Sequence, residues 1–190
     1  MPHLADYPPM LLDERPLDLD EPGGIYEIQY NGYRVGAAFD RGVVQLRSRK
    51  GADATKWFPE ITQALATIKG QYVVDGEICV LDELGRSDFD KLQDRARRRR
   101  WYAGASPVVY CIFDLLVNRG VDITRQPLVK RKAALSTVFR PSRPGILVVQ
   151  HFDDQAGRIF EEAVIPLKLE GIVAKRAASA YLPACVRATG

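Results

Sequence analysis

Apolar and polar residues alternate in several short runs along the chain, and alternation with a period of two predicts β-strands. Tight polar turns separate the first three runs, at Asn31-Gly32 and at Asp40-Arg41-Gly42. We therefore expect the first three strands to form an antiparallel meander. The predicted strands span residues 25–30, 34–39, 43–47, 71–82, 107–116, 146–152 and 169–175.

Apolar residues at helical spacing predict helices between these strands. Ile61, Leu65 and Ile68 recur on one face, Asp88 is suited to cap a helix, and Pro127 is suited to begin one. The predicted helices span residues 57–68, 88–100, 127–139 and 155–165. Antiparallel strands mixed with helices indicate an α+β domain.

The first 24 residues differ from the rest of the chain. They are rich in Pro, Asp and Leu, with prolines at positions 8, 9, 16 and 22. Because proline at this density disfavours a helix, residues 1–24 are predicted to form an extended arm over the domain. The remaining residues, 25–190, are predicted to form one domain, since they contain neither an internal repeat nor a low-complexity linker.

The composition fits a globular domain of ordinary size. The chain has 190 residues, of which 46% are hydrophobic, so it can bury a sizeable core. No apolar run approaches the ~18 residues that a membrane span needs. The N-terminal 20 residues contain Arg15 as their only Lys or Arg and no apolar signal-peptide region. We therefore expect no association with a membrane.

The three cysteines, Cys79, Cys111 and Cys185, are widely spaced and odd in number. Neither a Cys-x-x-Cys motif nor a Cys/His cluster is present, so the sequence predicts neither a zinc site nor a disulfide framework. We expect Cys79 and Cys111 to be buried, inert thiols. This usage fits a reducing cytoplasm.

The formal net charge is only +3, but arginine strongly outnumbers lysine among the 27 basic residues. Eight are lysines, and the first of these is Lys50. Arginine suits bidentate contacts with phosphate, which is compatible with a nucleotide or a nucleic acid as ligand.

Five sequence blocks, in a consistent order, carry a family resemblance. They lie at residues 29–34, 47–51, 74–78, 110–116 and 169–176, the last followed by Tyr181-Leu182-Pro183. Together they resemble the adenylation domain of bacterial ATP-dependent DNA ligases, in particular the ligase module of end-joining repair enzymes, from about Pro9 to Pro183. The resemblance implies the DNA ligase and mRNA capping enzyme type of nucleotidyltransferase fold, which is ATP-grasp-like, with antiparallel sheets flanked by helices.

The block at residues 29–34 departs from the family pattern, which reads Lys, any residue, Asp, Gly, any residue, Arg. Gln29 stands at the lysine position and Asn31 at the aspartate position, whereas Gly32 and Arg34 agree with the pattern. In the family the lysine amine attacks the α-phosphorus of ATP and holds AMP as a phosphoramidate. A glutamine amide has no available lone pair, so the resemblance predicts a domain that does not adenylylate itself at this position.

The resemblance implies a nucleotide site for ATP or AMP that the other blocks supply. Glu27 and the backbone of Ile28 would face the adenine edge. The side chains of Arg34 and Arg49 would contact ribose and phosphate oxygens, and Glu77 would accept hydrogen bonds from the ribose hydroxyls.

Three further roles are implied in the same way. Phe113 would stack on adenine, Lys175 would neutralise charge on the α-phosphate, and Glu170 with Glu77 would help to place Mg²⁺. Taken singly, the two glutamates would also fit exposed strand carboxylates, and Phe113 would fit a core position. The joint pattern is what favours the functional interpretation.

Four consecutive arginines, Arg97, Arg98, Arg99 and Arg100, close the predicted helix at residues 88–100. They would fit a solvated last turn that complements the helix dipole, or a contact with a phosphate backbone. The adjoining Trp101 would fit a base-stacking position, or a core plug.

The C-terminal sequence also departs from the family, which continues to a block with two further lysines and then to an OB-fold domain. No lysine follows Lys175, so the domain at residues 25–190 is predicted to end before the last lysine block and to lack the OB-fold domain.

The sequence leaves several functions open. One is a pseudoenzyme that binds nucleotide and has lost self-adenylylation, and another is a residual ligase that seals nicks already carrying a 5′-adenylate. A module that binds nucleic acid or a partner without nucleotide is a third, and an RNA ligase or capping-type substrate is a weaker fourth. Nicked duplex DNA, other repair proteins and a separate OB-fold chain are the candidate partners, with a nucleoid location if DNA is bound.

Overall fold

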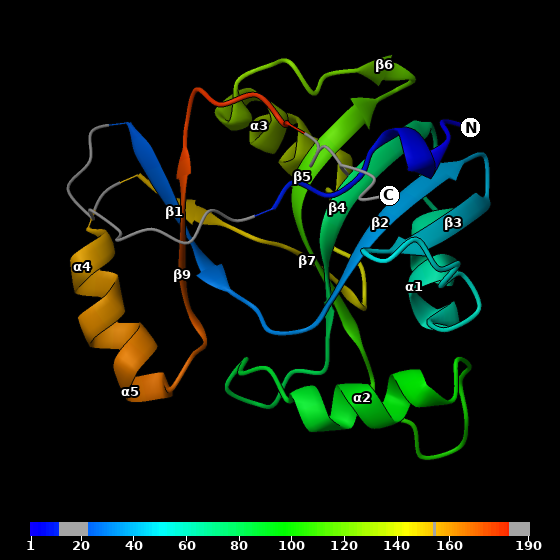
Figure 1. Cartoon of the computed structure of the whole chain (residues 1–190), viewed down its shortest axis with the longest axis horizontal. Coiled ribbons are helices and arrows are strands. Elements are labelled where there is room, and N and C mark those ends of the chain that lie inside the picture. The colour runs from blue at the N-terminus through cyan, green and yellow to red at the C-terminus, as the bar shows by residue number, and fades with distance from the viewer. Residues whose placement is uncertain (12–22, 154, 183–190) are drawn as a thin grey trace, which may run out of the picture.

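The computed structural model describes residues 1–11, 23–153 and 155–182, and within them the strands form two sheets (Figure 1). The larger sheet has six strands in the order β3-β2-β4-β5-β6, with β7 beside β5, and the smaller has three in the order β8-β1-β9. The strands are β1 (Gly24–Gln29), β2 (Tyr33–Asp40), β3 (Val43–Ser48), β4 (Gln71–Cys79), β5 (Val109–Asn118), β6 (Val121–Asp122), β7 (Ile146–Val148), β8 (His151–Phe152) and β9 (Gly171–Arg176).

Helices flank these sheets, as the α+β prediction requires. They are the 3-10 turn η1 (Leu4–Asp6), α1 (Pro59–Ala66), α2 (Phe89–Arg97), α3 (Leu128–Val138), α4 (Ala156–Ile159), the π-helical segment η2 (Phe160–Val164) and α5 (Ile165–Leu167). The Asp88 carboxylate accepts the backbone N–H of Lys91 at 3.0 Å, so it caps α2 as expected. The helix predicted at residues 155–165 is present as the continuous series α4, η2 and α5.

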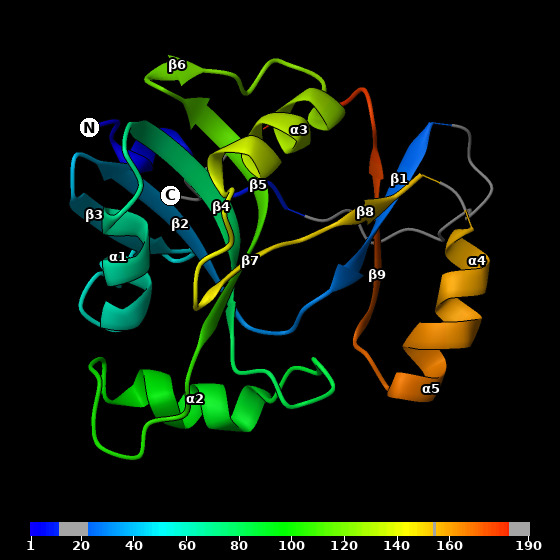
Figure 2. The same ribbon diagram turned by 180° about the vertical axis from the view of Figure 1, so that it is seen from behind.

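The main core lies between one face of the larger sheet and the helices α1, α2 and α3 (Figures 1 and 2). A smaller cluster covers the opposite face, where the N-terminal segment packs on β2, β4 and β5. The main core contains Val35, Phe39, Leu46, Ile61, Leu65, Leu92, Ile112 and Leu135, and the smaller cluster contains Leu4, Ala38, Val73, Leu116 and Tyr181.

The predicted meander of the first three strands is wrong. Strands β2 and β3 form an antiparallel hairpin, but β1 pairs with β8 and β9 in the other sheet. The chain crosses from one sheet to the other at Asn31-Gly32, where the backbone passes very close to β4. A Cβ on Gly32 would lie 2.3 Å from the carbonyl oxygen of Ile78, so only glycine allows this crossing.

The single strand predicted at residues 146–152 is two strands in different sheets. Strand β7 runs parallel to β5, whereas β8 pairs antiparallel with β1. This segment is therefore a second connection between the sheets, and alternation of residue types alone cannot reveal the change of partner. The two-residue strand β6 was missed because it is too short for a periodic pattern.

Other expectations have mixed outcomes. Cys79 and Cys111 are buried free thiols, as predicted, while Cys185 lies outside the described residues. The predicted arm contains the 3-10 turn η1, and its residues 12–22 also lie outside the described part. Among the described helices, none has the length and apolar character to cross a membrane.

Candidate functional site

The block at residues 29–34, which departs from the family pattern, lies where the two sheets meet. Gln29 ends β1, is half-buried and is paired with Gly171 of β9. The backbone N–H of Asn31 donates to Ser87 Oγ at 3.0 Å, and its side-chain Nδ2 lies 3.5 Å from Glu170 Oε2. Both departures from the family pattern are therefore structurally accommodated, and Asn31 lies beside the carboxylate that the resemblance assigns to a metal.

Glu27 lies on the same face of β1 as Gln29, because alternate strand residues share a face. It is only 2% exposed, and two amines share its carboxylate. Lys132 Nζ donates to Oε1 at 2.6 Å, and Lys175 Nζ donates to Oε2 at 2.6 Å. The Glu27 side chain thus joins β1 to β9 and to α3.

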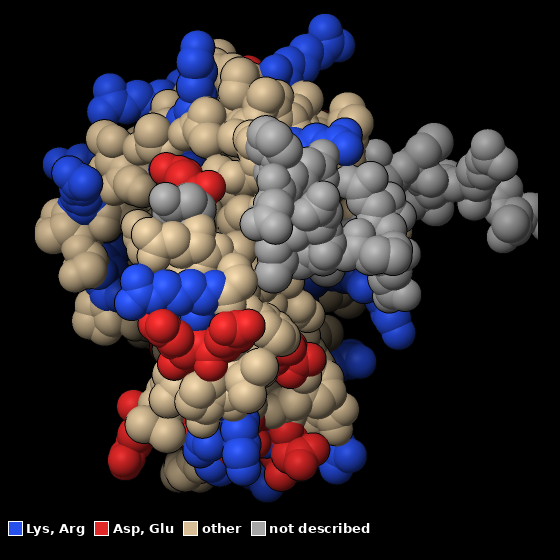
Figure 3. Space-filling view, turned by 90° about the vertical axis from the view of Figure 1, so that its left-hand side faces the viewer, with Lys and Arg blue, Asp and Glu red and all other residues tan. Residues whose placement is uncertain are grey.

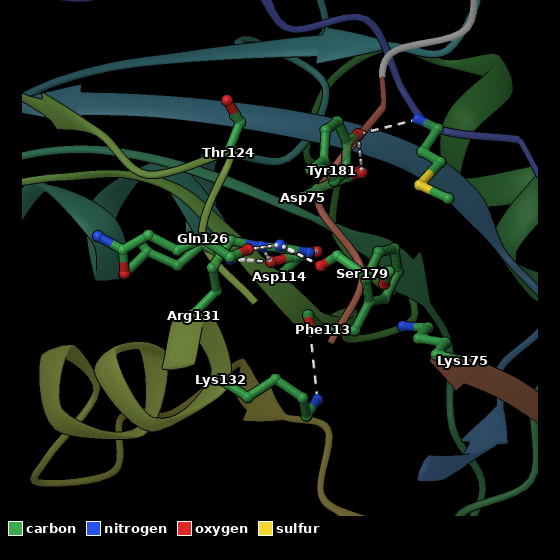
Figure 4. Close-up of polar contacts among 12 residues, drawn as sticks. Asp75, Phe113, Asp114, Thr124, Gln126, Arg131, Lys132, Lys175, Ser179 and Tyr181 are labelled. Atoms are coloured by element: carbon green, nitrogen blue, oxygen red, sulfur yellow. Dashed lines mark hydrogen bonds and ion pairs between the residues drawn. The ribbon is translucent and has the colours of Figure 1, made fainter. Parts of the chain in front are cut away.

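Lys132 was not foreseen as part of this site. Its amine also donates to the carbonyl oxygens of Val149 at 3.0 Å and Phe113 at 3.4 Å (Figure 4). Burial lowers the pKa of Lys132, and the Glu27 carboxylate opposes that shift. The available signal was a lysine at helical spacing between two apolar residues, Leu128 and Leu135, on the inner face of α3.

The Phe113 ring is half-buried and lies next to two cations. The guanidinium carbon of Arg34 is 4.4 Å from the ring centroid, and Lys175 Nζ is 4.5 Å from it. Such cation–π contacts are favourable and orient the charged groups around the ring. The structure therefore brings together three residues, Phe113, Arg34 and Lys175, that the resemblance assigns to one nucleotide.

Arg34 is held by partners that the sequence did not identify. It forms a bidentate ion pair with Asp75, at 2.8 Å from Nε to Oδ1 and 2.8 Å from Nη2 to Oδ2. Tyr181 donates its hydroxyl to Asp75 Oδ2 at 2.6 Å and accepts the backbone N–H of Met10 at 2.9 Å (Figure 4). This network fixes the Arg34 guanidinium and ties both ends of the described chain to it. Asp75 lies in the sequence block at residues 74–78 and Tyr181 follows the last block, but nothing in their spacing indicates a partner.

Glu77 lies on β4 in register with Arg34 of β2. Burial raises the pKa of Glu77 to about 7, while Arg34, the Gly32 backbone N–H and Arg49 act in the opposite direction and Asp75 reinforces the shift. A carboxyl group with this pKa changes charge near neutral pH. The exposed Arg49 reaches the same region, and its backbone N–H donates to the Arg34 carbonyl oxygen at 3.0 Å.

A cavity of about 320 Å³ adjoins this site between the N-terminal segment, β2, β4 and the turn at residues 47–51. Arg34, Arg49 and Asp75 line it, whereas Glu77 and Phe113 do not. The cavity therefore represents only the part of the candidate site on one side of Arg34, and the contacts around Phe113 and Glu27 locate the rest.

The candidate metal residues do not form a complete binding site by themselves. Glu170 is exposed and Glu77 is half-buried. No cluster of three or more His, Cys, Asp or Glu residues suited to a metal occurs within the described part of the chain. Mg²⁺ commonly takes one or two carboxylates together with phosphate oxygens, so these glutamates fit the ion only if a nucleotide supplies further ligands.

The four consecutive arginines are exposed; Arg97 ends α2 and the other three follow it. Arg98 stacks on Tyr102 and Arg99 on Trp57, at 4.0 and 5.2 Å from guanidinium carbon to ring centroid. Trp101 is 59% exposed, so its interpretation as a core plug is wrong.

Comparison with known proteins identifies the family. The model of the ATP dependent DNA ligase domain matches residues 9–189. The chain is 33% identical over 157 residues to the multifunctional non-homologous end joining protein LigD of Pseudomonas aeruginosa, covering 82% of this chain and 18% of that protein. It is also 33% identical over 190 residues to DNA ligase C2 of Mycolicibacterium smegmatis, covering 96% and 52%.

Solved structures agree with this assignment. The ligase domain of LigD from M. tuberculosis superposes with a TM-score of 0.70 at 29% identity, covering 85% of this chain and 51% of that one. A mycobacterial DNA ligase D complexed with ATP and MES gives a TM-score of 0.69 at 29% identity, covering 85% and 50%. This chain thus spans about half of those ligase structures and smaller shares of the LigD proteins. Since the family model covers nearly all of its residues, the chain belongs to the ATP-dependent DNA ligase family.

Proposed function

We propose that this domain binds ATP or AMP where its two sheets meet and does not form a covalent adenylate at position 29. The proposal is supported by the mycobacterial ligase D complexed with ATP and by the grouping of Arg34, Phe113 and Lys175 around one partly exposed ring. Phe113 would stack on adenine, Glu77 would accept from the ribose, and Arg34 and Arg49 would contact ribose and phosphate oxygens.

The observation that carries the proposal is the state of the amines around Glu27. Gln29 offers no nucleophile, and Lys132 and Lys175 both direct Nζ to the single carboxylate of Glu27. A lysine amine attacks only when it is unprotonated and its lone pair is free. Hydrogen bonds to the buried Glu27 carboxylate hold both amines, so neither is free to replace the missing lysine.

The same pocket would serve a different reaction without a lysine nucleophile. Sealing a nick that already carries a 5′-adenylate requires AMP recognition, and Lys175 would neutralise charge on the phosphate that is attacked. Mg²⁺ would supply Lewis-acid stabilisation there, with Glu77 and Glu170 as its protein contacts. This reaction is the second candidate function.

Three assays on the full chain separate the candidates. Equilibrium dialysis with α-labelled ATP, followed by a denaturing gel, is expected to show binding without a covalent label. Ligation of a nick with a preformed 5′-adenylate tests the second candidate. Absence of ATP and AMP binding, together with duplex binding that ignores nucleotide and Mg²⁺, would refute the proposal and favour a plain nucleic-acid-binding module.

A further inference from the structure

The last residue of α2 and the turn that follows it present an unusual set of charges. We call residues 97–102 the arginine turn, since it contains four arginines followed by Trp101 and Tyr102. All four arginines are exposed. Arg97 lies 3.8 Å from the exposed Asp94, a weak contact, and the described residues place no carboxylate within ion-pair distance of the other three.

Buried contacts fix the backbone of the arginine turn. Arg95 has a fully buried side chain, and its Nη2 binds both carboxylate oxygens of Glu60 at 3.0 Å. Its Nη1 donates to the carbonyl oxygen of Arg100 at 2.6 Å. Arg95 therefore fastens the turn to α1, and the exposed arginines project from a fixed frame.

Aromatic rings then orient two of the guanidinium groups. Arg98 stacks on Tyr102, and Arg99 stacks on Trp57, the residue two positions before α1. Stacking uses the flat face of a guanidinium and leaves its N–H edge available. Within the described chain these N–H groups have no acceptor, and both side chains are exposed, so their donors are accessible to a ligand.

The backbone conformation of Arg99 also favours a functional role for this turn. Arg99 has φ of +50°, in the left-handed region that residues other than glycine and asparagine seldom adopt. An uncommon conformation held by buried contacts is a reason to look for function at that position. The side of the molecule that carries α4 and α5 differs, because acidic and basic side chains gather there together (Figure 3), as in the pair Arg158–Glu162 at 2.9 Å.

We infer that the arginine turn is a docking surface for the phosphate backbone of duplex DNA, centred on Arg98 and Arg99. Phosphate oxygens match the bidentate N–H edge of arginine, and such contacts position a protein on DNA without reading its sequence. The inference rests on the proposed function in taking DNA as the partner, but it does not depend on nucleotide binding.

The test measures binding of the full chain to a fluorescent nicked duplex by anisotropy over a series of KCl concentrations. The double variant Arg98→Gln/Arg99→Gln is expected to bind ~10-fold more weakly at moderate salt, and the slope of log affinity against log salt should fall by about 1 to 2. The matched control is Arg119→Gln/Arg125→Gln, which removes two exposed arginines from the loops that flank β6, and Arg119 also has a left-handed φ of +50°. The control should change affinity by less than ~2-fold.

Equal weakening by both double variants would show that only overall charge matters, and it would overturn the inference. An unchanged affinity in the Arg98/Arg99 variant, or no duplex binding by the wild type, would overturn it as well. Equilibrium binding of ATP, measured on the same proteins, should be unaffected by the Arg98/Arg99 change. If the wild type does not bind ATP, the proposed function is contradicted, but this inference about DNA is not affected.

Discussion

The two sheets contribute unequally to the candidate nucleotide site. The larger sheet carries Arg34, Glu77 and Phe113, which agree with the ligase pattern and lie close to one another. The smaller sheet ends at Gln29, where the pattern requires a lysine. Under the proposed function, most of nucleotide recognition and the covalent chemistry would depend on different elements of this fold, so one could change while the other stays.

Glu27 connects the two halves. It belongs to the smaller sheet, but one of its two lysine partners, Lys132, comes from α3, which packs against the larger sheet. Its carboxylate holds Lys175 and Lys132 on either side of the junction. The smaller sheet therefore retains a structural role at the site even without its nucleophile.

The largest expected effect comes from restoring the family residues in the smaller sheet. Gln29→Lys combined with Asn31→Asp should convert the protein from one that forms no adduct to one that carries AMP covalently after incubation with ATP and Mg²⁺. The new amine would share a strand face with Glu27 and stand where the family has its nucleophile. Intact mass would detect the adduct.

Gln29→Met/Asn31→Asp serves as the control, since it has a side chain of similar length without an amine, and it should stay unlabelled. If the lysine variant binds ATP at equilibrium but never acquires AMP, residues outside the smaller sheet also prevent the covalent reaction. The assignment of covalent chemistry to the smaller sheet would then be wrong.

The second effect concerns the junction. Glu27→Gln should lower the free energy of unfolding by about 3–5 kcal/mol, since it leaves two amines without their buried carboxylate. Lys132→Met should cost less, because Glu27 would keep Lys175. Urea denaturation of both variants measures the difference. A larger loss for Lys132→Met than for Glu27→Gln would show that Lys175 does not compensate.

The third effect tests recognition by the larger sheet. Phe113→Ala should weaken ATP binding by about 1–3 kcal/mol, or roughly 5- to 150-fold in Kd, because a stacking surface is lost. Phe113→Trp keeps an aromatic ring and should lose much less affinity. Isothermal titration can make the comparison, after thermal melting has shown that both variants are folded. Equal losses of affinity in the two variants would show that stacking on Phe113 does not contribute to ATP binding.

The smallest effect is a pH dependence centred on Glu77. Because burial raises its pKa from 4.5 to about 7, the folded protein binds this proton more tightly than the unfolded chain does. The resulting stability is fully present below about pH 4.5 and is lost as the pH rises through 7. Relative to Glu77→Gln, the wild type should therefore lose on the order of 1–2 kcal/mol between about pH 5 and pH 8. Parallel stability curves for the two proteins would contradict the raised pKa.

Much of the fold could be predicted because most elements carry a local pattern. Strands β4 and β5 are long apolar runs, and Asp88 marks the start of α2. The pairing of β1 could not be predicted, because an alternating run specifies a strand and not its partner. The close passage of Gly32 against Ile78, which separates β1 from β2, is visible only in three dimensions.

The candidate site was located from the sequence through the family resemblance, while its internal contacts were not. The ion pairs of Glu27 with Lys132 and of Arg34 with Asp75 join residues 105 and 41 positions apart. No periodic pattern encodes contacts at such separations. The functional roles of Glu27, Ile28, Arg34, Arg49, Glu77, Phe113, Glu170 and Lys175 remain predictions, and the Phe113 variants above test the stacking role directly.

The most direct measurement of the central claim is the intact mass of the wild-type protein after incubation with ATP and Mg²⁺, with ATP binding measured on the same sample by equilibrium dialysis. Recognition without a nucleophile predicts bound ATP and an unchanged protein mass. A mass increase of one adenylyl group would contradict the account, and peptide mapping would then show which of the eight lysines, all at or beyond Lys50, had taken over the reaction.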